Sequence, residues 1–222
     1  APEEFAPVIA LLIVVLTMLF SAISFGCCIM YAVRFYKNLF TDEGYITWTL
    51  PASPLTQLWA KILSASIWYV LDLTICFAAA WFLISGDNIQ SALERIKPDF
   101  QAALGMSFSS FCGLVVFFSF VGILSCVLFI YTSIAIGQLV PAHRIIVSIA
   151  VYFILNLITQ IISIGVSIIT SVFPDYVFSP AQTSFSEYFF QMLLIGTCTT
   201  TVLAIAGYFI TYRILQRKVN LI

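Results

Sequence analysis

The run SFSSFCGLVVFFSFVGILSCVLFIYTSIAIG, residues 107–137, contains no charged side chain. The nearest charges are Asp99 before it and Arg144 after it. A helix needs about 20 apolar residues to cross a hydrocarbon core that is ~30 Å thick, and a charge near the centre of that core is costly. Apolar residues lie on all sides of such a helix, which is typical of a membrane span and not of an amphipathic helix on a soluble core.

The composition of the whole chain points the same way. Of its 222 residues, 62% are hydrophobic and 9% are charged, whereas charged residues make up about 25% of ordinary globular domains. Nine Lys and Arg residues nearly balance ten Asp and Glu residues, so the net charge indicates no nucleic-acid partner. The sequence therefore predicts an all-α, polytopic integral membrane protein with membrane lipid around it.

Four further charge-poor runs have the same character, and only one of them is interrupted by a charge, at Asp72. We predict one transmembrane domain whose five visible spans lie at about 7–34, 60–85, 107–137, 145–172 and 188–212. A loop at 35–59 joins the first two spans. Loops at 86–106 and 173–187 lie on the opposite side of the membrane.

The distribution of Lys and Arg sets the orientation, because these residues collect on the cytoplasmic side. Five spans place most of the basic residues together: Arg34, Lys37, Lys61, Arg144, Arg213, Arg217 and Lys218. Reading the long third run as a helical hairpin would move Arg144 and the basic tail outside. We therefore predict a single long third helix, an outside N-terminus and a cytoplasmic C-terminus.

The loop after the first span contains TDEGYITWTLPASP, Thr41–Pro54, which predicts a short helix at 42–50. Thr41 is suited to cap its N-terminus. The negative charges of Asp42 and Glu43 in the first turn interact favourably with the positive end of the helix dipole. Tyr45, Ile46 and Thr49 would share one face of this helix, with Trp48 nearby.

Two proline signals mark the end of this helix and the start of the next. Pro51 disfavours helical geometry at Leu50 and so ends the short helix. Ser53 is suited to cap the second span, with Pro54 at the first helical position. The short helix would thus be held between two membrane helices at both ends.

The stretch RFYKNLFTDEGYITWTLPASPLTQLWAKIL, residues 34–63, resembles the cytoplasmic loop of bacterial type-2 ATP-binding-cassette (ABC) transporter permeases, particularly the small Gram-positive forms. The family pattern is an acidic residue with Gly, a hydrophobic stretch, Leu-Pro, a small hydroxyl residue and a later Lys. In this chain those places are filled by Glu43, Gly44, the run Tyr45 to Thr49, Leu50, Pro51, Ser53 and Lys61.

The resemblance implies a transport function. In this family the loop follows the second of six spans, so we expect a further span and an interfacial helix on the N-terminal side of Ala1. The loop would be a coupling helix that docks on a separate cytoplasmic ATPase subunit through Thr41, Asp42, Glu43, Gly44, Tyr45, Ile46, Trp48, Leu50, Pro51 and Ser53. ATP and Mg would bind that ATPase, so this chain would hold no cofactor and no catalytic residue.

The same resemblance implies two permeases, identical or paralogous, and two ATPases in the working transporter. It places the chain in the bacterial plasma membrane and makes export the expected direction, without indicating a substrate. The sequence contains no phosphate-binding loop, no GxGxxG turn and no GxSxG elbow, which are the motifs that nucleotide or acyl-transfer chemistry would require. The six cysteines all fall in predicted spans without metal-ligand spacing, and we interpret them as small packing residues.

Asp72 is the residue that invites a functional hypothesis, because a carboxylate in the middle of a span must face protein or water. It is either a pathway residue or a packing residue bonded to polar groups of a neighbouring helix, and we favour packing. Polar candidates form a stripe on the fourth span and continue on the fifth: Ser148, Tyr152, Asn156, Gln160, Ser163, Ser167, Gln191 and the run Thr197 to Thr201. This stripe is equally consistent with helix packing and with a pathway lining.

Two other classes of function remain open. Asp72 could carry a proton in an ion-coupled secondary transporter, although the spans show neither an inverted repeat nor paired broken helices. Alternatively, the chain could be a structural subunit of a membrane complex. In the loop 86–106, Ile89, Leu93 and Ile96 have helical spacing, which predicts a short amphipathic helix on the membrane surface that Pro98 ends or bends.

Overall fold

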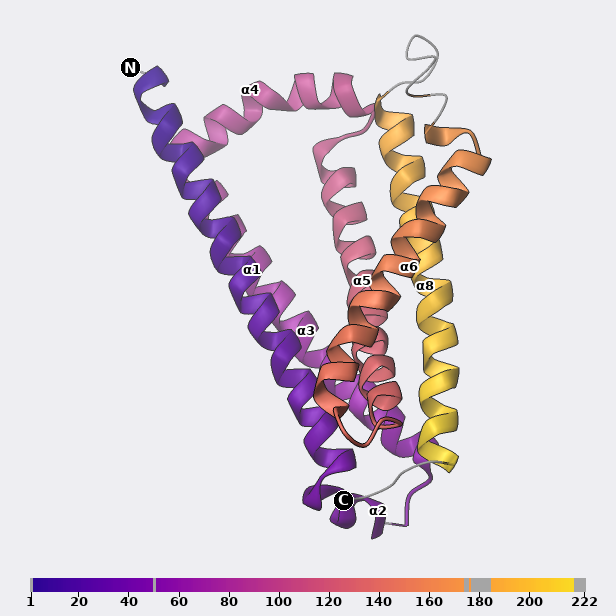
Figure 1. The fold of residues 1–222 in the computed structure, drawn as a ribbon. Helices are drawn as coiled ribbons and strands as arrows, with labels where there is room; N and C mark the ends of the chain where they lie inside the picture. The colour runs from indigo at the N-terminus through magenta and orange to yellow at the C-terminus, as the bar shows by residue number, and fades with distance from the viewer. Residues whose placement is uncertain (1, 50, 174–175, 177–184, 218–222) are drawn as a thin grey trace.

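The computed structural model describes residues 2–49, 51–173, 176 and 185–217. The elements described there are helices joined by short turns: α1 (Pro2–Phe40), α2 (Asp42–Thr49), α3 (Pro54–Ile84), α4 (Asp87–Leu104), α5 (Phe108–Gly137), α6 (Arg144–Ile169) and α8 (Phe185–Arg217), as Figure 1 shows. Five of these described helices, α1, α3, α5, α6 and α8, are long and apolar enough to cross a membrane. The predicted fold class is confirmed.

The helices differ from the predicted spans chiefly at their ends. α1 continues past Arg34 to Phe40, and α3 begins at Pro54, so the first loop is shorter than the predicted 35–59. The prediction ended spans at charges, but a helix continues into water where its backbone bonds are still satisfied. α5 is one continuous helix, and the helical hairpin is therefore excluded. Most of the predicted loop 173–187 lies outside the described residues.

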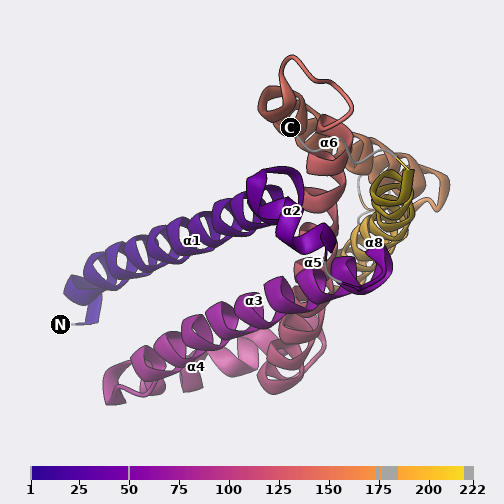
Figure 2. The same ribbon diagram turned by 90° about the horizontal axis from the view of Figure 1, so that it is seen from below.

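The helices form a bundle from which one pair diverges. α5, α6 and α8 pack together, whereas α1 and α3 contact them near α2 and leave them toward the opposite end, as the two views show (Figures 1 and 2). α4 crosses from α3 to α5 at that opposite end, at a steep angle to the spans (Figure 1). The molecule thus has an α2 end and an α4 end.

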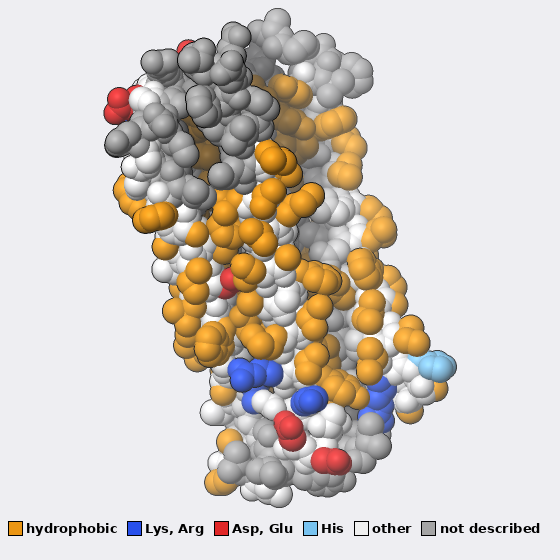
Figure 3. Space-filling model, turned by 90° about the vertical axis from the view of Figure 1, so that its left-hand side faces the viewer, with side chains coloured by type: hydrophobic (Ala, Val, Ile, Leu, Met, Phe, Trp, Pro, Cys, Tyr) orange, Lys and Arg blue, Asp and Glu red, His pale blue; other side chains and the backbone are white. Residues whose placement is uncertain are grey.

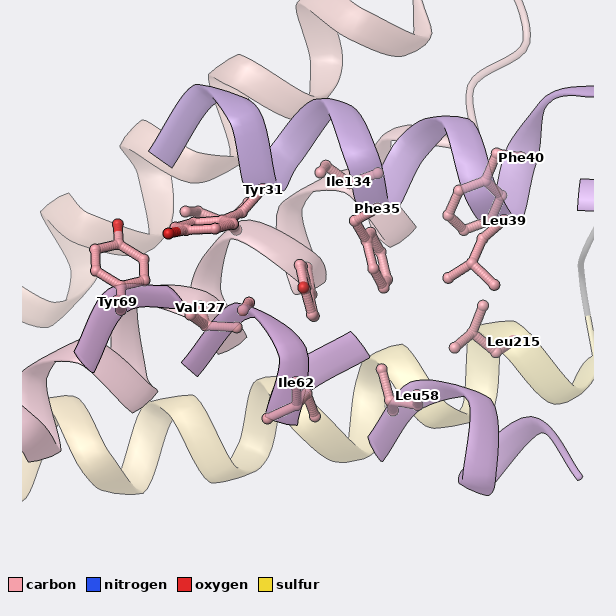
Figure 4. Packing of buried hydrophobic residues seen from close by; sticks show 13 residues of the cluster. Tyr31, Phe35, Leu39, Phe40, Leu58, Ile62, Tyr69, Val127, Ile134 and Leu215 are labelled. Atoms are coloured by element: carbon pink, nitrogen blue, oxygen red, sulfur yellow. The ribbon is translucent and has the colours of Figure 1, made fainter. Parts of the chain in front are cut away.

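The buried core lies at the α2 end, because that is where α1, α3, α5 and α8 meet. Leu39, Leu58 and Leu215 come from three of these helices and point toward one another (Figure 4), and each is at most 3% exposed. The Phe35 ring stacks on the Tyr131 ring with centroids 3.8 Å apart. Farther along α1, apolar side chains such as Met18 are exposed, at 69%, which suits a helix surrounded by lipid.

α5 and α8 approach closely because a glycine lies at their contact. A Cβ on Gly207 would lie 2.6 Å from Thr132 Oγ1, and the Thr211 hydroxyl of α8 donates to Thr132 Oγ1 at 3.1 Å. Small residues and hydroxyl bonds of this kind hold membrane helices together, since lipid offers no hydrophobic force between them.

α4 confirms the predicted helix in the loop 86–106, and of the two predicted effects of Pro98, an end or a bend, the helix does not end there. The helix runs through Pro98 to Leu104 and closes at Gly105, whose φ is 66° and whose N–H donates to the Gln101 carbonyl at 2.9 Å. Proline removes only one helix hydrogen bond. The turn after it is held by the Phe100 ring, which packs edge-on against Phe108 and Phe111 at the start of α5. The side chains of Ile89, Leu93 and Ile96 are outside the described set.

Candidate functional site

The connection between α1 and α3 has the helical pattern that the sequence predicts. α2 begins at Asp42 and ends at Thr49, just before Pro51, and its first turn carries Asp42 and Glu43. Ser53 caps α3, because its Oγ accepts the Thr56 N–H at 3.2 Å and its carbonyl accepts the Gln57 N–H at 3.1 Å. Leu50 lies outside the described residues, as do the side chains of residues 45–48, which include the predicted contacts Tyr45, Ile46 and Trp48.

Thr41 bonds differently from the side-chain cap that the sequence predicts. Its hydroxyl donates to the Lys37 carbonyl in the last turn of α1 at 2.7 Å. The bond into α2 comes from the backbone, where the Gly44 N–H donates to the Thr41 carbonyl at 2.7 Å. Because α1 extends to Phe40, its last carbonyls need hydrogen-bond donors at this point. The sequence prediction ended the first span at residue 34 and therefore assigned no such role to Thr41. Gly44 is buried at this junction.

A side-chain bridge joins α2 to both membrane helices beside it. The Asn38 amide, oriented so that both of its neighbours are satisfied, donates to Glu43 Oε2 at 2.9 Å and accepts from Lys61 Nζ at 2.7 Å. We call these three residues the Asn38 bridge. Charged partners make such hydrogen bonds stronger than neutral ones, so the bridge restrains α2 against the end of α1 and the first turns of α3.

Tyr131 fixes the α3 side of this bridge. Its hydroxyl, which comes from α5, donates to the Lys61 carbonyl at 3.0 Å, and its ring lies against Phe35 of α1. The sequence resemblance included Glu43 and Lys61 but not Asn38 or Tyr131. The position of Asn38, a polar residue a little more than one helical turn before Glu43, was the only hint in the sequence that it could bond there. Nothing in the sequence indicates that Tyr131 bonds to Lys61.

We predict that Tyr131→Phe weakens this junction without unfolding the protein. The substitution keeps the ring against Phe35 and removes one hydrogen bond to a backbone carbonyl, which contributes about 1 kcal/mol. Thermal unfolding of the purified protein in detergent should show a small decrease in midpoint. Tyr208→Phe is the control, because the structure gives that half-buried tyrosine a ring contact with Trp59. A larger loss for Tyr208→Phe than for Tyr131→Phe would contradict the assignment.

Asp72 lies between α3 and α1. The Ser24 hydroxyl donates to its Oδ2 at 3.2 Å, and no described hydrogen bond joins Asp72 to the predicted polar partners on α6 or α8. The described partner of Asp72 is therefore on α1, which leaves the bundle together with α3 (Figures 1 and 2). Carboxylate and hydroxyl therefore form a polar contact between the two diverging helices.

The polar stripe of α6 is satisfied largely within its own helix. The Ser148 hydroxyl donates to the Arg144 carbonyl and the Asn156 amide donates to the Tyr152 carbonyl, each at 2.8 Å. Ser163 alone makes a described side-chain bond to α8, to Thr199 Oγ1 at 2.5 Å. The two glutamines of the stripe, Gln160 and Gln191, are exposed. The described bonds do not bring the stripe together with Asp72 as one site.

A thiol and hydroxyl cluster lies closer to the α2 end. The Tyr69 hydroxyl contacts Cys28 Sγ and lies 3.9 Å from Cys126 Sγ, so it joins α1, α3 and α5. The Tyr69 ring also packs against Tyr31 with centroids 4.8 Å apart. All six cysteines are free thiols, and no three His, Cys, Asp or Glu side chains of the described residues converge as metal ligands would.

Comparisons of the chain with protein-family models, with curated proteins and with solved structures gave no match. The described structure establishes a multi-pass membrane protein with five long apolar helices.

Proposed function

We propose that this chain is the membrane-spanning permease subunit of an ABC transporter, an exporter of the small type-2 form. In this proposal it forms half of a translocation pathway with a second permease, and a separate subunit hydrolyses ATP. The sequence of residues 34–63 supplies the resemblance, and the structure of the same residues supports the mechanical role.

The observation that carries the proposal is the Asn38 bridge. A helix that transmits movement must be coupled to the membrane helices on both sides, since a flexible loop would absorb the displacement. α2 is followed by a capped α3 and is bonded through Asn38 to the ends of α1 and α3. Displacement of α2 by an ATPase would therefore move α1 and α3, the two helices that diverge from the bundle (Figure 1).

The proposed orientation places α2 in the cytoplasm. Basic side chains gather below the apolar band, at the α2 end of the molecule (Figure 3). Arg34 and Lys37 on α1, Lys61 on α3, Arg144 on α6 and Arg213 on α8 all belong to this end of their helices. Such a distribution is typical of the cytoplasmic face and supports a plasma-membrane protein with its C-terminus inside.

Asp72 supports this proposal better than it supports a proton carrier. Its bond to Ser24 links the same two helices that α2 would move. A polar contact of this kind contributes about 1 kcal/mol between membrane helices, which favours joint movement of α1 and α3. A proton carrier would instead require a chain of titratable groups that leads from Asp72 to both sides of the membrane.

Affinity purification from the membranes of the source organism tests the proposal. The tagged chain should retain an ATPase with a phosphate-binding loop, identified by mass spectrometry, and the eluate should hydrolyse MgATP. In a matched chain, residues 42–49 are replaced by a Gly-Ser segment of equal length. That chain should reach the membrane and lose the ATPase. If the ATPase is missing from both preparations, or is retained equally by both, the proposed coupling is refuted.

A further inference from the structure

A pocket of about 230 Å³ opens between α1, α3 and α5 at the α2 end. Its polar and aromatic lining includes Arg34, Asn38, Lys61, Ser64, Trp68 and Tyr131. At ~30 Å³ for each water molecule, the space corresponds to about eight waters. That volume is sufficient for a phosphate group with part of a glycerol.

The pocket is suited to an anion because two cations from different helices line it. Lys61 Nζ donates one bond to Asn38, and an ammonium group has three donors. Arg34 contributes a guanidinium, whose planar fork matches two phosphate oxygens at once. None of the lining residues is acidic, and the Glu43 carboxylate next to the pocket is bonded to the Asn38 amide.

The position of the pocket favours a lipid over a free anion. The basic side chains lie at the lower edge of the apolar band (Figure 3), which is the depth of phospholipid headgroups. Above Lys61 on α3, Ser64 lies one turn away and Trp68 two turns away, and the Trp68 ring is 50% exposed. Ile67 and Leu71 next to it are 59% and 47% exposed, so acyl chains would have an apolar surface directly beside the cations.

We propose that this pocket binds the headgroup phosphate of an anionic phospholipid in the membrane leaflet at the α2 end. Arg34 and Lys61 hold the phosphate, Ser64 offers a hydroxyl, and the acyl chains pass along Trp68. Basic pockets between membrane helices bind anionic headgroups in this way. The inference goes beyond the proposed transport function, because it requires only this chain and a bilayer.

The lipid would have a defined mechanical consequence. Arg34 on α1 and Lys61 on α3 repel each other as like charges, and a phosphate between them replaces that repulsion with two attractions. Because Lys61 also belongs to the Asn38 bridge, the lipid would hold α1 and α3 together at the point where α2 is attached.

Quenching of Trp68 by brominated lipids tests the proposal. The chain has four tryptophans, so the variant Trp48→Phe/Trp59→Phe/Trp81→Phe leaves Trp68 as the reporter. The variant is placed in phosphatidylcholine vesicles that contain an equal fraction of either brominated phosphatidylglycerol or brominated phosphatidylcholine. We expect phosphatidylglycerol to be enriched beside Trp68 by about fivefold or more. Equal quenching by the two lipids would refute the proposal.

Charge-neutralising variants assign the effect to the pocket. Arg34→Gln/Lys61→Gln should remove the preference for phosphatidylglycerol, whereas Lys37→Gln, an equal charge change on an exposed α1 residue outside the lining, should keep it. Arg34→Gln alone should reduce the preference and replaces the double variant if the latter does not fold, as judged by circular dichroism. Added inorganic phosphate should leave the quenching unchanged. Two results would overturn the lipid assignment. One is loss of the preference when phosphate is added, and the other is a loss in Lys37→Gln as large as that in Arg34→Gln/Lys61→Gln.

Discussion

Under the proposed function, a Glu43→Lys chain is expected to insert into the membrane normally and to lose stimulation of the proposed ATPase partner. Glu43 is exposed in the first turn of α2, where its charge is favourable to the helix dipole and its Oε2 accepts from Asn38 at 2.9 Å. Lysine reverses the charge, removes the acceptor and places a cation near Lys61. α2 would then lose the Asn38 bridge to α1 and α3, and the proposed ATPase would lose an acidic contact.

The measurement is MgATP hydrolysis by the purified ATPase, with and without the permease in proteoliposomes. Glu94→Lys is the matched control, because Glu94 is an exposed acidic residue on α4 at the opposite end of the molecule; its stimulation should equal that of the unchanged chain. Tyr45→Ala, chosen from the sequence motif, should also abolish stimulation. Full stimulation in both Glu43→Lys and Tyr45→Ala would show that α2 is not the docking element.

Gly137→Ala is expected to destabilise the folded protein by about 1–3 kcal/mol, the usual cost of overpacking. Gly137 is the last residue of α5, and the chain returns at once into α6. A Cβ at this position would lie 2.8 Å from the Arg144 carbonyl oxygen and 2.9 Å from the Ser148 backbone N, besides meeting the Ser148 hydroxyl. A side chain can rotate away, but backbone atoms move only if the start of α6 is displaced.

Gly113→Ala is the control for this substitution. Gly113 also lies in α5, and a Cβ there meets nothing within 4 Å, so alanine should be neutral or stabilising by up to ~1 kcal/mol through helix propensity. Thermal unfolding in detergent should therefore separate the two variants, with a lower midpoint for Gly137→Ala. Equal midpoints would mean that α6 adjusts freely and that the close approach is not needed for folding.

The helices and their order followed from the sequence to an unusual degree, and the physical reason is the membrane. A charge-free run such as Phe108–Gly137 has few alternatives to a spanning helix, because unsatisfied backbone groups are too costly in hydrocarbon. The end of α2 near Pro51 and the start of α3 after Ser53 were also predictable, since a proline and a helix cap act on their immediate neighbours in the sequence. That α4 continues past Pro98 could not be predicted locally, because the Phe100 contacts that hold its last turns are made with α5.

The candidate site was only partly predictable, since its residues are defined by pairing across helices. Glu43 and Lys61 belong to a linear motif. The role of Asn38 as their shared partner is seen only in the structure, where the end of α1 lies between α2 and α3. Ser24 as the partner of Asp72, and Arg34 as the neighbour of Lys61 in one pocket, depend on the side of α3 that faces α1.

By itself, the sequence determined that this is an all-helical membrane protein, how many long apolar helices it shows, and where a short helix interrupts them, because each of these depends on nearest neighbours and on the transfer of side chains into lipid. The tertiary structure alone decided which polar groups meet, that α1 and α3 diverge together from the bundle, and that the core gathers at the α2 end. Those features follow from the rotation and tilt of helices that are apolar on all sides, and such helices carry no amphipathic pattern from which their contact faces can be read.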